Sequence, residues 1–265
     1  MKGPTARASL RHSETKMKIF ASAGAGFNWA DVDALDRRGI WYCNGAGASD
    51  EAVSDTALFM ILSVFRNFGG HREGAHPEQF LAMHRLVGSI SYNPRGHVLG
   101  NVGLGNISKL LAFRAQDSTG NENSLLRRLT LRQYITPTHE LLSVADCVTL
   151  HTPLNKYTQD FIKKETFAAM KDGTSLVNTA RRQVSGKVAA AGLDVHHHEP
   201  QVSKELAAMN NVTLACHNGG ASITMRINSE LNAMKNILQV NGSDGEFSGA
   251  PPITPVNEKA FKGSS

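Results

Sequence analysis

Short runs of apolar, β-prone residues recur along the chain, and most of them lead into glycine or a polar turn. Such runs are typical of buried strands. Other stretches carry apolar residues at the spacing of a helix with one buried face. Because the two kinds of segment alternate, the pattern predicts an α/β fold with a parallel sheet. The predicted strands are 18–21, 40–43, 98–102, 147–150, 175–177 and 212–214, and the predicted helices are 29–38, 49–66, 107–114, 140–144 and 164–170.

The composition narrows the class of protein. Hydrophobic residues make up 41% and charged residues 19%, which excludes disordered, collagen-like and coiled-coil chains. No apolar run reaches the length of a bilayer span, so we expect no membrane helix. Cys43, Cys147 and Cys216 lie far apart, and this spacing argues against a disulfide framework and a zinc knuckle. We therefore expect a reducing compartment, the cytoplasm.

The net charge is +5 and the isoelectric point is about 9.2. A basic balance fits a nucleic-acid partner, an enzyme that binds anions, or no specific partner. The lysines and arginines are scattered along the chain without a long basic run. The sequence therefore predicts no nucleic-acid partner, and salt-sensitive retention of DNA would be the contrary result.

A glycine loop follows the predicted strand 98–102 and opens the predicted helix 107–114. Gly103 allows a tight turn, Gly105 lets the backbone approach a pyrophosphate, and N–H groups at the start of the helix then bind the phosphates. Ser108 stands where the motif has a third glycine. The loop predicts a dinucleotide site for NAD or NADP, although an ordinary strand–turn–helix carries the same pattern.

An acidic residue that would bind the ribose is not evident. Asp117 and Glu122 lie near the expected position, but the segment 117–123 is polar and no apolar strand-like run directly precedes either residue. We therefore assign no ribose-binding acid. The choice between NAD and NADP stays open.

In the C-terminal half, short strand-like runs lead into segments with reactive side chains. These segments are 177–182, with two arginines, 191–200, with an aspartate and a glutamate, and 214–220, with a histidine. Ligands of open parallel sheets bind at the carboxyl ends of the strands. We therefore expect the three segments to contribute to one site.

Longer stretches around these segments match one family in order over most of the chain. Among them are Asn-Thr-Ala-Arg at 178–181 and Glu-Pro at 199–200. The chain resembles the D-isomer-specific 2-hydroxyacid dehydrogenases, and is especially similar to the fungal D-mandelate dehydrogenases. The matching stretches are 20–29, 52–58, 93–105, 151–154, 170–173, 178–181, 193–195 and 199–220.

The resemblance implies a Rossmann-type doubly wound parallel sheet with a truncated flavodoxin-like substrate domain. It implies an oxidoreductase that transfers a hydride between NAD(P)H and a 2-keto acid or D-2-hydroxy acid of the mandelate or glyoxylate/hydroxypyruvate type. It also implies a small-molecule substrate and a homodimer. The alternative is a catalytically impaired family member that acts only as a binding protein or is a non-functional product.

The family's catalytic Arg, Glu and His match Arg181, Glu199 and His217. An arginine can bind the substrate carboxylate through two N–H groups and polarise the carbonyl. A histidine suits proton transfer near neutral pH, and a carboxylate behind it favours the charged imidazole and fixes its tautomer. Without the resemblance, Arg181 beside Arg182 is equally a surface charge. Glu199 is then a turn residue before proline, and His217 a core histidine.

Further positions carry over from the resemblance. Ala25 and Gly26 would present backbone N–H groups to the substrate carboxylate. We expect no metal, because adjacent residues of the histidine run 196–198 face alternate sides of an extended chain. The positions implied to contact the cofactor are Gly103, Gly105, Asn106, Ile107, Pro153, Thr158, Thr179, Ala180, Asp194 and Gly219.

The expected domains are a remnant of the substrate domain at 1–47, an NAD(P)-binding Rossmann domain at 48–221 with internal deletions, and a C-terminal helix and tail at 222–265 that return to the substrate domain. Pieces of the family's fold are expected to be missing. The sequence after the predicted helix 107–114 is polar and predicts no second strand. The step 184–188 is too short for the crossover helix that a parallel connection requires.

Overall fold

The computed structural model describes residues 17–27, 29–70, 76–115, 127–130, 138–152, 162–180, 188–196 and 199–257. The chain divides into a larger unit, Glu51–Gly220, and a smaller unit that joins Met1–Asp50 to Ala221–Ser265. Each unit has its own sheet and its own apolar core.

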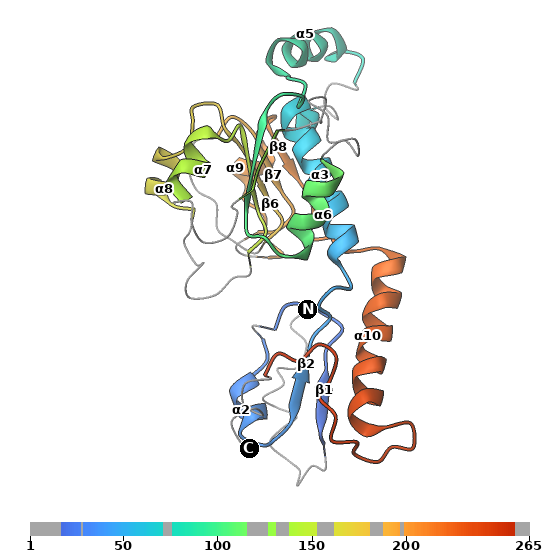
Figure 1. Ribbon diagram of the computed structural model, residues 1–265. Helices are drawn as coiled ribbons and strands as arrows, with labels where there is room; N and C mark the ends of the chain where they lie inside the picture. Colours follow the sequence, from blue (N-terminus) through green and yellow to red (C-terminus); the bar gives the residue numbers. More distant parts are fainter. Residues whose placement is uncertain are drawn as a thin grey trace. The chain divides into compact units, whose positions relative to one another are not determined.

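The larger unit is built around a six-stranded sheet in which every neighbouring pair is parallel (Figure 1). Its strands are β3 (Val98–Val102), β4 (Arg127–Thr130), β5 (Cys147–Leu150), β6 (Ser175–Asn178), β7 (Ala191–Leu193) and β8 (Val212–Leu214). Their order in the sheet is β4-β3-β5-β6-β7-β8. From β3 the strand order runs to β4 on one side and to β5 and the later strands on the other. Open α/β sheets bind ligands where the strand order reverses in this way.

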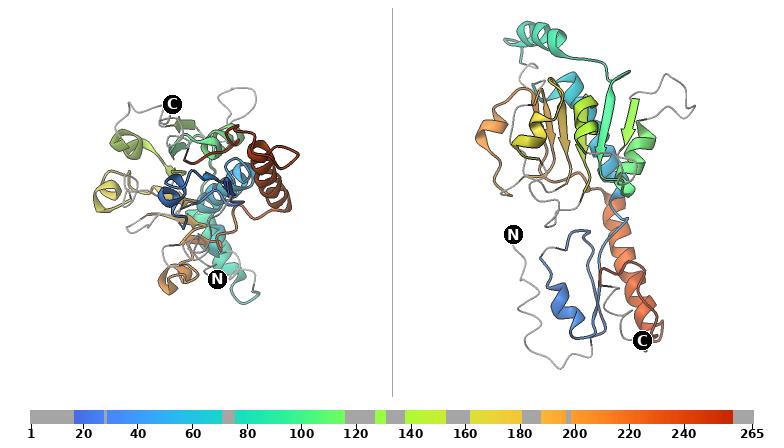
Figure 2. Two further views of the ribbon diagram at one scale, coloured as in Figure 1. Left: turned by 90° about the horizontal axis from the view of Figure 1, so that it is seen from below. Right: turned by 60° about the vertical axis from the view of Figure 1, so that its left-hand side comes forward.

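Helices cover both faces of this sheet (Figure 1, Figure 2). On one face lie α3 (Asp50–Arg66) and α6 (Asn106–Arg114), and on the other α7 (Thr138–Val144) and α8 (Lys164–Ala168). Helices on both faces are what parallel strands joined by crossover connections require. The other helical segments described in this unit are η1 (Phe68–Gly70), α5 (Phe80–Ile90) and α9 (Lys204–Ala207).

Successive residues of β3 face the two helical layers in turn. Leu99 packs with Met60 and Ile61 of α3, and all three side chains are buried. Burial of each such side chain contributes about 1.5–3 kcal/mol. At the next position, a Cβ on Gly100 would lie 2.9 Å from the Cβ of Ala145, so glycine lets the end of α7 approach the sheet.

The smaller unit is a short parallel pair of strands with a helix between them. Leu35, Ile40 and Tyr42 form its buried centre. The C-terminal segment returns to this unit, because the backbone N–H of Tyr42 donates a hydrogen bond of 2.9 Å to the side-chain oxygen of Asn257. The elements of this unit are β1 (Ile19–Ala21), α2 (Val32–Asp36), β2 (Trp41–Cys43) and α10 (Ile223–Asn241).

The predicted α/β fold with a parallel sheet is confirmed. β1, β2, β3, β5, β6 and β8 are the strands that the sequence predicts, and α3, α6, α7 and α8 fall on predicted helices. The predicted helix 29–38 is shorter, since α2 begins at Val32. Its start is fixed by Asp31, whose carboxylate accepts a hydrogen bond of 3.1 Å from the N–H of Ala34.

The expectation that the second strand is absent was wrong. β4 pairs in parallel with β3, in a register that joins Val98 to Arg127 and Asn101 to Thr130. Among the strands that the structure describes, β4 lies at the edge of the sheet and pairs with β3 alone. Edge strands tolerate charged and polar residues, so the sequence Arg-Arg-Leu-Thr gives no apolar signal. The predicted gap at 184–188 lies mostly outside the described residues.

Within the described ranges, no helix has both the length and the apolar character needed to cross a membrane.

Candidate functional site

The glycine loop after β3 has the backbone that a phosphate site requires. Gly103 has φ 103°, and a Cβ there would lie 2.8 Å from the Cγ2 of Thr152, so no other residue fits without a shift. Gly105 is the N-cap of α6 and faces open space. Gly105 has no side chain that could cap the helix, and no capping side chain is found among the described residues, so the N–H groups of the first turn, at Asn106 and Ile107, suit an anion. The loop fits a dinucleotide's phosphates.

Ser108, the departure from the glycine motif, is fully buried in the first turn of α6. Its hydroxyl has no hydrogen-bond partner among the described residues. A side chain of this size is therefore accommodated at the third position of the motif, where close packing of helix on strand favours glycine.

His151 links the carboxyl ends of three neighbouring strands beside this loop. Its backbone N–H donates a bond of 2.9 Å to the carbonyl of Val102, at the end of β3. Its Nδ1 lies 3.2 Å from the hydroxyl of Thr179, and its Nε2 bonds to the hydroxyl of Thr149. Desolvation lowers the pKa of His151 to about 4, so the ring is neutral near pH 7.

We expect His151 to make stability pH-dependent between about pH 4 and pH 6.5. The unfolded chain protonates this histidine near its ordinary pKa of 6.5, and the folded chain near 4. The unfolded state thus binds more protons in this window, and stability falls as the pH falls. The loss is about 2 kcal/mol by pH 5.

Urea unfolding of the wild type and His151→Gln at pH 7 and pH 5 measures this contribution. The fall in unfolding free energy is expected to be about 2 kcal/mol smaller in the variant. His139, an exposed histidine, supplies the control, because His139→Gln should keep the wild-type pH dependence. Equal pH dependence in His151→Gln and the wild type would refute the assignment.

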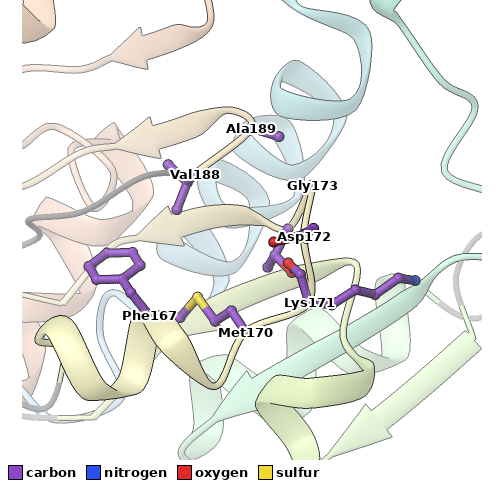
Figure 3. A pocket seen from close by; sticks show the side chains of 8 residues that line it. Phe167, Met170, Lys171, Asp172, Gly173, Val188 and Ala189 are labelled. Atoms are coloured by element: carbon purple, nitrogen blue, oxygen red, sulfur yellow. The ribbon is translucent and has the colours of Figure 1, made fainter.

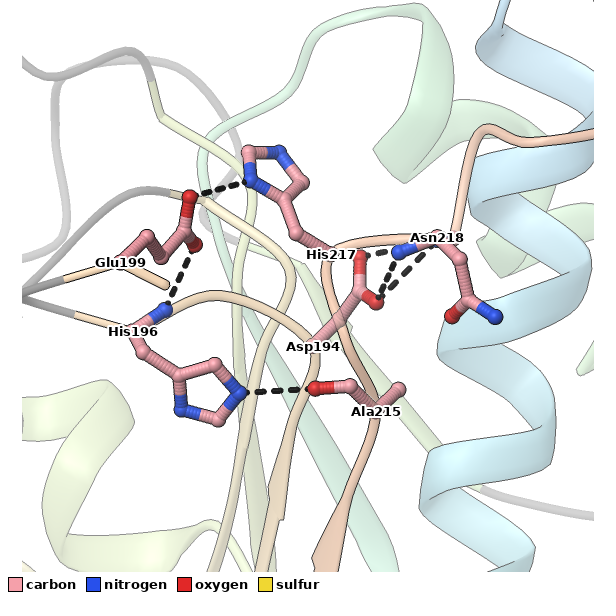
Figure 4. Close-up of polar contacts among 7 residues, drawn as sticks. Asp194, His196, Glu199, Ala215, His217 and Asn218 are labelled. Atoms are coloured by element: carbon pink, nitrogen blue, oxygen red, sulfur yellow. Dashed lines mark hydrogen bonds and ion pairs between the residues drawn. The ribbon is translucent and has the colours of Figure 1, made fainter. Parts of the chain in front are cut away.

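Glu199 and His217 form a hydrogen-bonded pair beyond β7 and β8 (Figure 4). The Nδ1 of His217 lies 2.8 Å from Oε2 of Glu199, and each side chain is 36% exposed. A carboxylate accepts, so Nδ1 carries the proton, and Nε2 is left for exchange with another group. The backbone of His217 has φ 56°, a left-handed conformation, and its N–H donates a bond of 2.7 Å to the carbonyl of Asp194.

Asp194 fixes the loop that carries His217. Its carboxylate, in a residue only 3% exposed, accepts a hydrogen bond of 3.0 Å from the N–H of Asn218 and bonds of 3.1 Å from the N–H of Gly219. On the other side, the hydroxyl of Thr56 donates a bond of 3.0 Å to the carbonyl of Gly219. A Cβ on Gly219 would lie 2.5 Å from the carboxylate, so glycine is needed for this approach.

In the smaller unit, the turn with Ala25 and Gly26 is held through its carbonyls. The side-chain amide of Asn44 donates a bond of 2.7 Å to the carbonyl of Ala25, and the indole N–H of Trp29 donates one of 3.0 Å to the carbonyl of Gly26. A peptide N–H points away from the carbonyl of the same peptide. Tying these carbonyls therefore sets the directions of the N–H groups of Gly26 and the residue after it.

Most predicted site residues of the larger unit lie at one edge of the sheet, the one formed by the carboxyl ends of its strands. The carboxyl ends of parallel strands share an edge, and the residues follow these ends directly. Ala25 and Gly26 belong to the smaller unit. Arg181, Pro153 and Thr158 lie outside the described residues. The residues at the shared edge are Gly103, Gly105, Asn106 and Ile107 after β3, Thr179 and Ala180 after β6, Asp194 and Glu199 after β7, and His217 and Gly219 after β8.

Sequence reasoning missed some polar side chains that support these residues. His151 and Thr56 lie within matching stretches and Asn44 lies between two of them, but nothing in the pattern distinguishes their hydrogen bonds from ordinary turn or core contacts. The sequence presents the histidine run 196–198 only as a candidate metal site. No group of three or more His, Cys, Asp or Glu within the described residues could hold a metal ion.

A cavity of about 180 Å³ lies away from this edge (Figure 3). Its lining includes Phe167, Met170 and Val188, together with the segment 171–174 that leads into the amino end of β6. The reactive residues follow the carboxyl ends of the strands, so this cavity belongs to the opposite end of the sheet.

Comparison with known proteins gives the same family from sequence and structure. The model of the NAD binding domain of D-isomer specific 2-hydroxyacid dehydrogenases matches residues 58–219. Glyoxylate reductase 1 of Saccharomyces cerevisiae is 34% identical over 243 residues, which are 82% of this chain and 67% of that protein. Hydroxypyruvate reductase of Thermotoga maritima is 31% identical over 242 residues, 81% of this chain and 74% of that protein.

Among solved structures, the apo form of Rhodotorula graminis D-mandelate dehydrogenase superposes with a TM-score of 0.77 at 40% identity, covering 90% of this chain and 74% of that one. The chain spans 63% to 78% of the length of eight curated relatives that it matches. The matched domain, the identities and the shared fold together show that this chain belongs to the D-isomer specific 2-hydroxyacid dehydrogenase family.

Proposed function

We propose that the chain transfers a hydride between NAD(P)H and a 2-keto acid or D-2-hydroxy acid. The observation that carries this proposal is the Glu199–His217 pair, which lies at the same edge of the sheet as the glycine loop. A site with both features has a place for a dinucleotide and a group that exchanges protons. Membership of the family supports the reaction class.

The chain's own residues supply the proton chemistry. When bound, the nicotinamide supplies the hydride that reaches the carbonyl carbon of the substrate. His217 would give its Nε2 proton to the carbonyl oxygen, so that the products are the 2-hydroxy acid and the oxidised cofactor. Glu199 accepts from Nδ1 and so holds the ring with Nε2 toward the substrate. In the reverse direction Nε2 accepts the hydroxyl proton.

Binding of the cofactor is assigned to the loops of the larger unit. The N–H groups of the first turn of α6 would bind the pyrophosphate. We propose the remaining positions from the resemblance and from their place after the strand ends. They are Pro153, Thr158, Thr179, Ala180, Asp194 and Gly219 for the rest of the cofactor, with either NAD or NADP as the dinucleotide.

Binding of the substrate carboxylate is assigned to Arg181, Ala25 and Gly26. Arg181 comes directly after Ala180, in the segment that leaves the carboxyl end of β6. A guanidinium offers a two-pronged contact to a carboxylate and would also polarise the substrate carbonyl. The relatives named glyoxylate reductase, hydroxypyruvate reductase and D-mandelate dehydrogenase support 2-keto acids of these types as substrates.

Turnover by the purified chain tests the function. NADH or NADPH is mixed with phenylglyoxylate, glyoxylate or hydroxypyruvate, and loss of the reduced cofactor is followed by its absorbance. We expect saturable oxidation with at least one pair, and a product of D configuration from phenylglyoxylate or hydroxypyruvate, since the glycolate formed from glyoxylate is achiral. If the chain binds the cofactor but turns over no pair, the proposal that it is an enzyme is overturned. The alternative from the sequence, a binding protein, would then remain.

Replacement of Asn44 tests the substrate-binding turn. We expect Asn44→Ala to raise the KM for the keto acid by about 3–10-fold, because one hydrogen bond of roughly 0.5–1.5 kcal/mol no longer orients the turn. The kcat should change less than twofold, since the proton-transfer pair is unaltered. Steady-state kinetics measure both values. Asn210→Ala, at an exposed position, is the control, and an unchanged KM in Asn44→Ala would contradict the assignment.

We also propose that the chain forms a homodimer and works in the cytoplasm. The amphipathic helix α5 has no buried residue, and Phe80, Leu81, Leu86 and Ile90 are exposed on it. Apolar side chains exposed together on one helix support association with a second copy. Analytical ultracentrifugation measures the mass. The cysteines Cys43, Cys147 and Cys216 are free, which supports a reducing compartment.

The domain assignment is a proposal of the same kind. The two strands of the smaller unit fit the remnant of a substrate domain at 1–47, and α10 with its tail fits the returning segment 222–265. The sheet of the larger unit fits the cofactor domain at 48–221. Limited proteolysis should then leave the larger unit intact when the smaller one is cut.

A further inference from the structure

We propose that His196 is a positioning residue that holds the Glu199 carboxylate in place for His217. The inference rests on the proposed function, since it assigns a role within the same proton-transfer pair. It concerns a side chain to which the family motif gives no part. The contacts that carry it run from the turn after β7 to the chain leaving β8 (Figure 4).

The backbone of His196 binds one oxygen of Glu199 directly. Its N–H donates a bond of 2.9 Å to Oε1 of the carboxylate, while Oε2 accepts from Nδ1 of His217 at 2.8 Å. The carboxylate therefore bridges the backbone of its own turn and the imidazole. The position of His196 sets where the carboxylate can lie.

The ring of His196 fixes that turn to the neighbouring strand. Its Nε2 lies 2.7 Å from the carbonyl oxygen of Ala215, which accepts, so Nε2 carries a proton. Ala215 follows β8 directly, two residues before His217, and its own N–H donates a bond of 2.9 Å to the carbonyl of Leu193 at the end of β7. The ring thus joins the segment that carries Glu199 to the segment that carries His217.

The hydrogen bond from His196 to Ala215 is needed because the Glu199–His217 pair cannot maintain its own geometry. Both side chains are 36% exposed, and ion pairs at exposed positions contribute only about 0–1 kcal/mol. Asp194 already fixes the loop of His217 by accepting hydrogen bonds from the N–H groups of Asn218 and Gly219. His196 performs the corresponding task for the turn of Glu199.

Two substitutions separate the hydrogen bond from the volume of the ring. His196→Phe keeps a planar ring and removes the N–H donor. His196→Gln retains an N–H donor at a similar distance from the backbone. We expect His196→Phe to lower kcat by about tenfold, the value of one well-placed hydrogen bond, with the Kd for NADH changed less than twofold. His196→Gln should recover most of the loss.

A double-mutant cycle shows whether the effect passes through Glu199. In the Glu199→Gln background, His196→Phe is expected to lower kcat by less than twofold, because the carboxylate that it positions is gone. A purely structural role would give the same tenfold loss in both backgrounds. His139→Phe, on the exposed side of α7, is the control and should leave kcat unchanged in both.

NMR of nitrogen-labelled histidine side chains decides the proposal without turnover. The wild type should show a protonated, hydrogen-bonded Nδ1 for His217, assigned by its absence in His217→Gln. His196→Phe should lose or broaden this signal, and His196→Gln should keep it. If the wild type turns over no keto acid, the proposed function fails, and the NMR result still decides the role of His196. An unchanged His217 signal in His196→Phe overturns the inference.

Discussion

His217→Gln is expected to lower kcat for keto-acid reduction by roughly 10²–10⁴-fold, the usual contribution of general acid–base catalysis. Glutamine keeps a polar side chain next to Glu199 but cannot deliver a proton from the position of Nε2. The Kd for NADH should stay within about twofold, because the phosphate-binding N–H groups lie on α6, after β3, and not on the loop that carries His217. Stopped-flow reduction and cofactor titration by fluorescence measure the two quantities.

The matched control is His139→Gln, which makes the same substitution at an exposed histidine on α7. It should leave kcat and the Kd as in the wild type. The assignment of His217 as the proton donor is wrong if its variant retains more than about a tenth of the wild-type kcat, since that residual rate leaves no room for a general acid.

Asp194→Ala is expected to destabilise the larger unit by about 3–5 kcal/mol. The substitution removes the acceptor of the N–H groups of Asn218 and Gly219, and each bond to a charged group contributes about 1.5–3 kcal/mol. Because this loop carries His217, turnover should fall together with stability. Urea unfolding followed by circular dichroism measures the change in free energy.

Asp194→Asn separates the charge from the shape of the side chain. Its remaining carbonyl oxygen can still accept a bond from the N–H groups, so we expect about half of the loss seen in Asp194→Ala. Asp172→Ala, at an exposed position, should change the free energy of unfolding by no more than about 0.5 kcal/mol. An Asp194→Ala variant as stable as Asp172→Ala would show that the carboxylate does not hold the loop.

The sequence predicts the fold best where local pattern and burial agree. The run 98–102 becomes β3 without a shift of either end, and the spacing in 49–66 becomes α3 almost unchanged. The prediction failed at β4, where pairing with β3 at a sheet edge stabilises a strand that carries two arginines. Pairing with a neighbouring strand is a tertiary effect, and a window of local sequence contains no sign of it.

The site is predicted in its residue types more than in its supports. Glu199 and His217 come from resemblance to the family, and their hydrogen bond follows from strand ends that lie side by side. The bond from His196 to the carbonyl of Ala215 depends on the positions of two loops, and a carbonyl is present at every residue. Sequence alone therefore cannot single out this support.

The left-handed backbone of His217 implies a trade-off between activity and stability. At φ 56°, any residue with a Cβ is less stable than glycine by about 1–2 kcal/mol, and asparagine tolerates the conformation better than histidine. A chain selected for stability alone would replace this histidine. Programmes that stabilise such enzymes through consensus or computed substitutions should hold position 217 fixed, because there a gain in stability and a loss of proton transfer would arrive in one mutation.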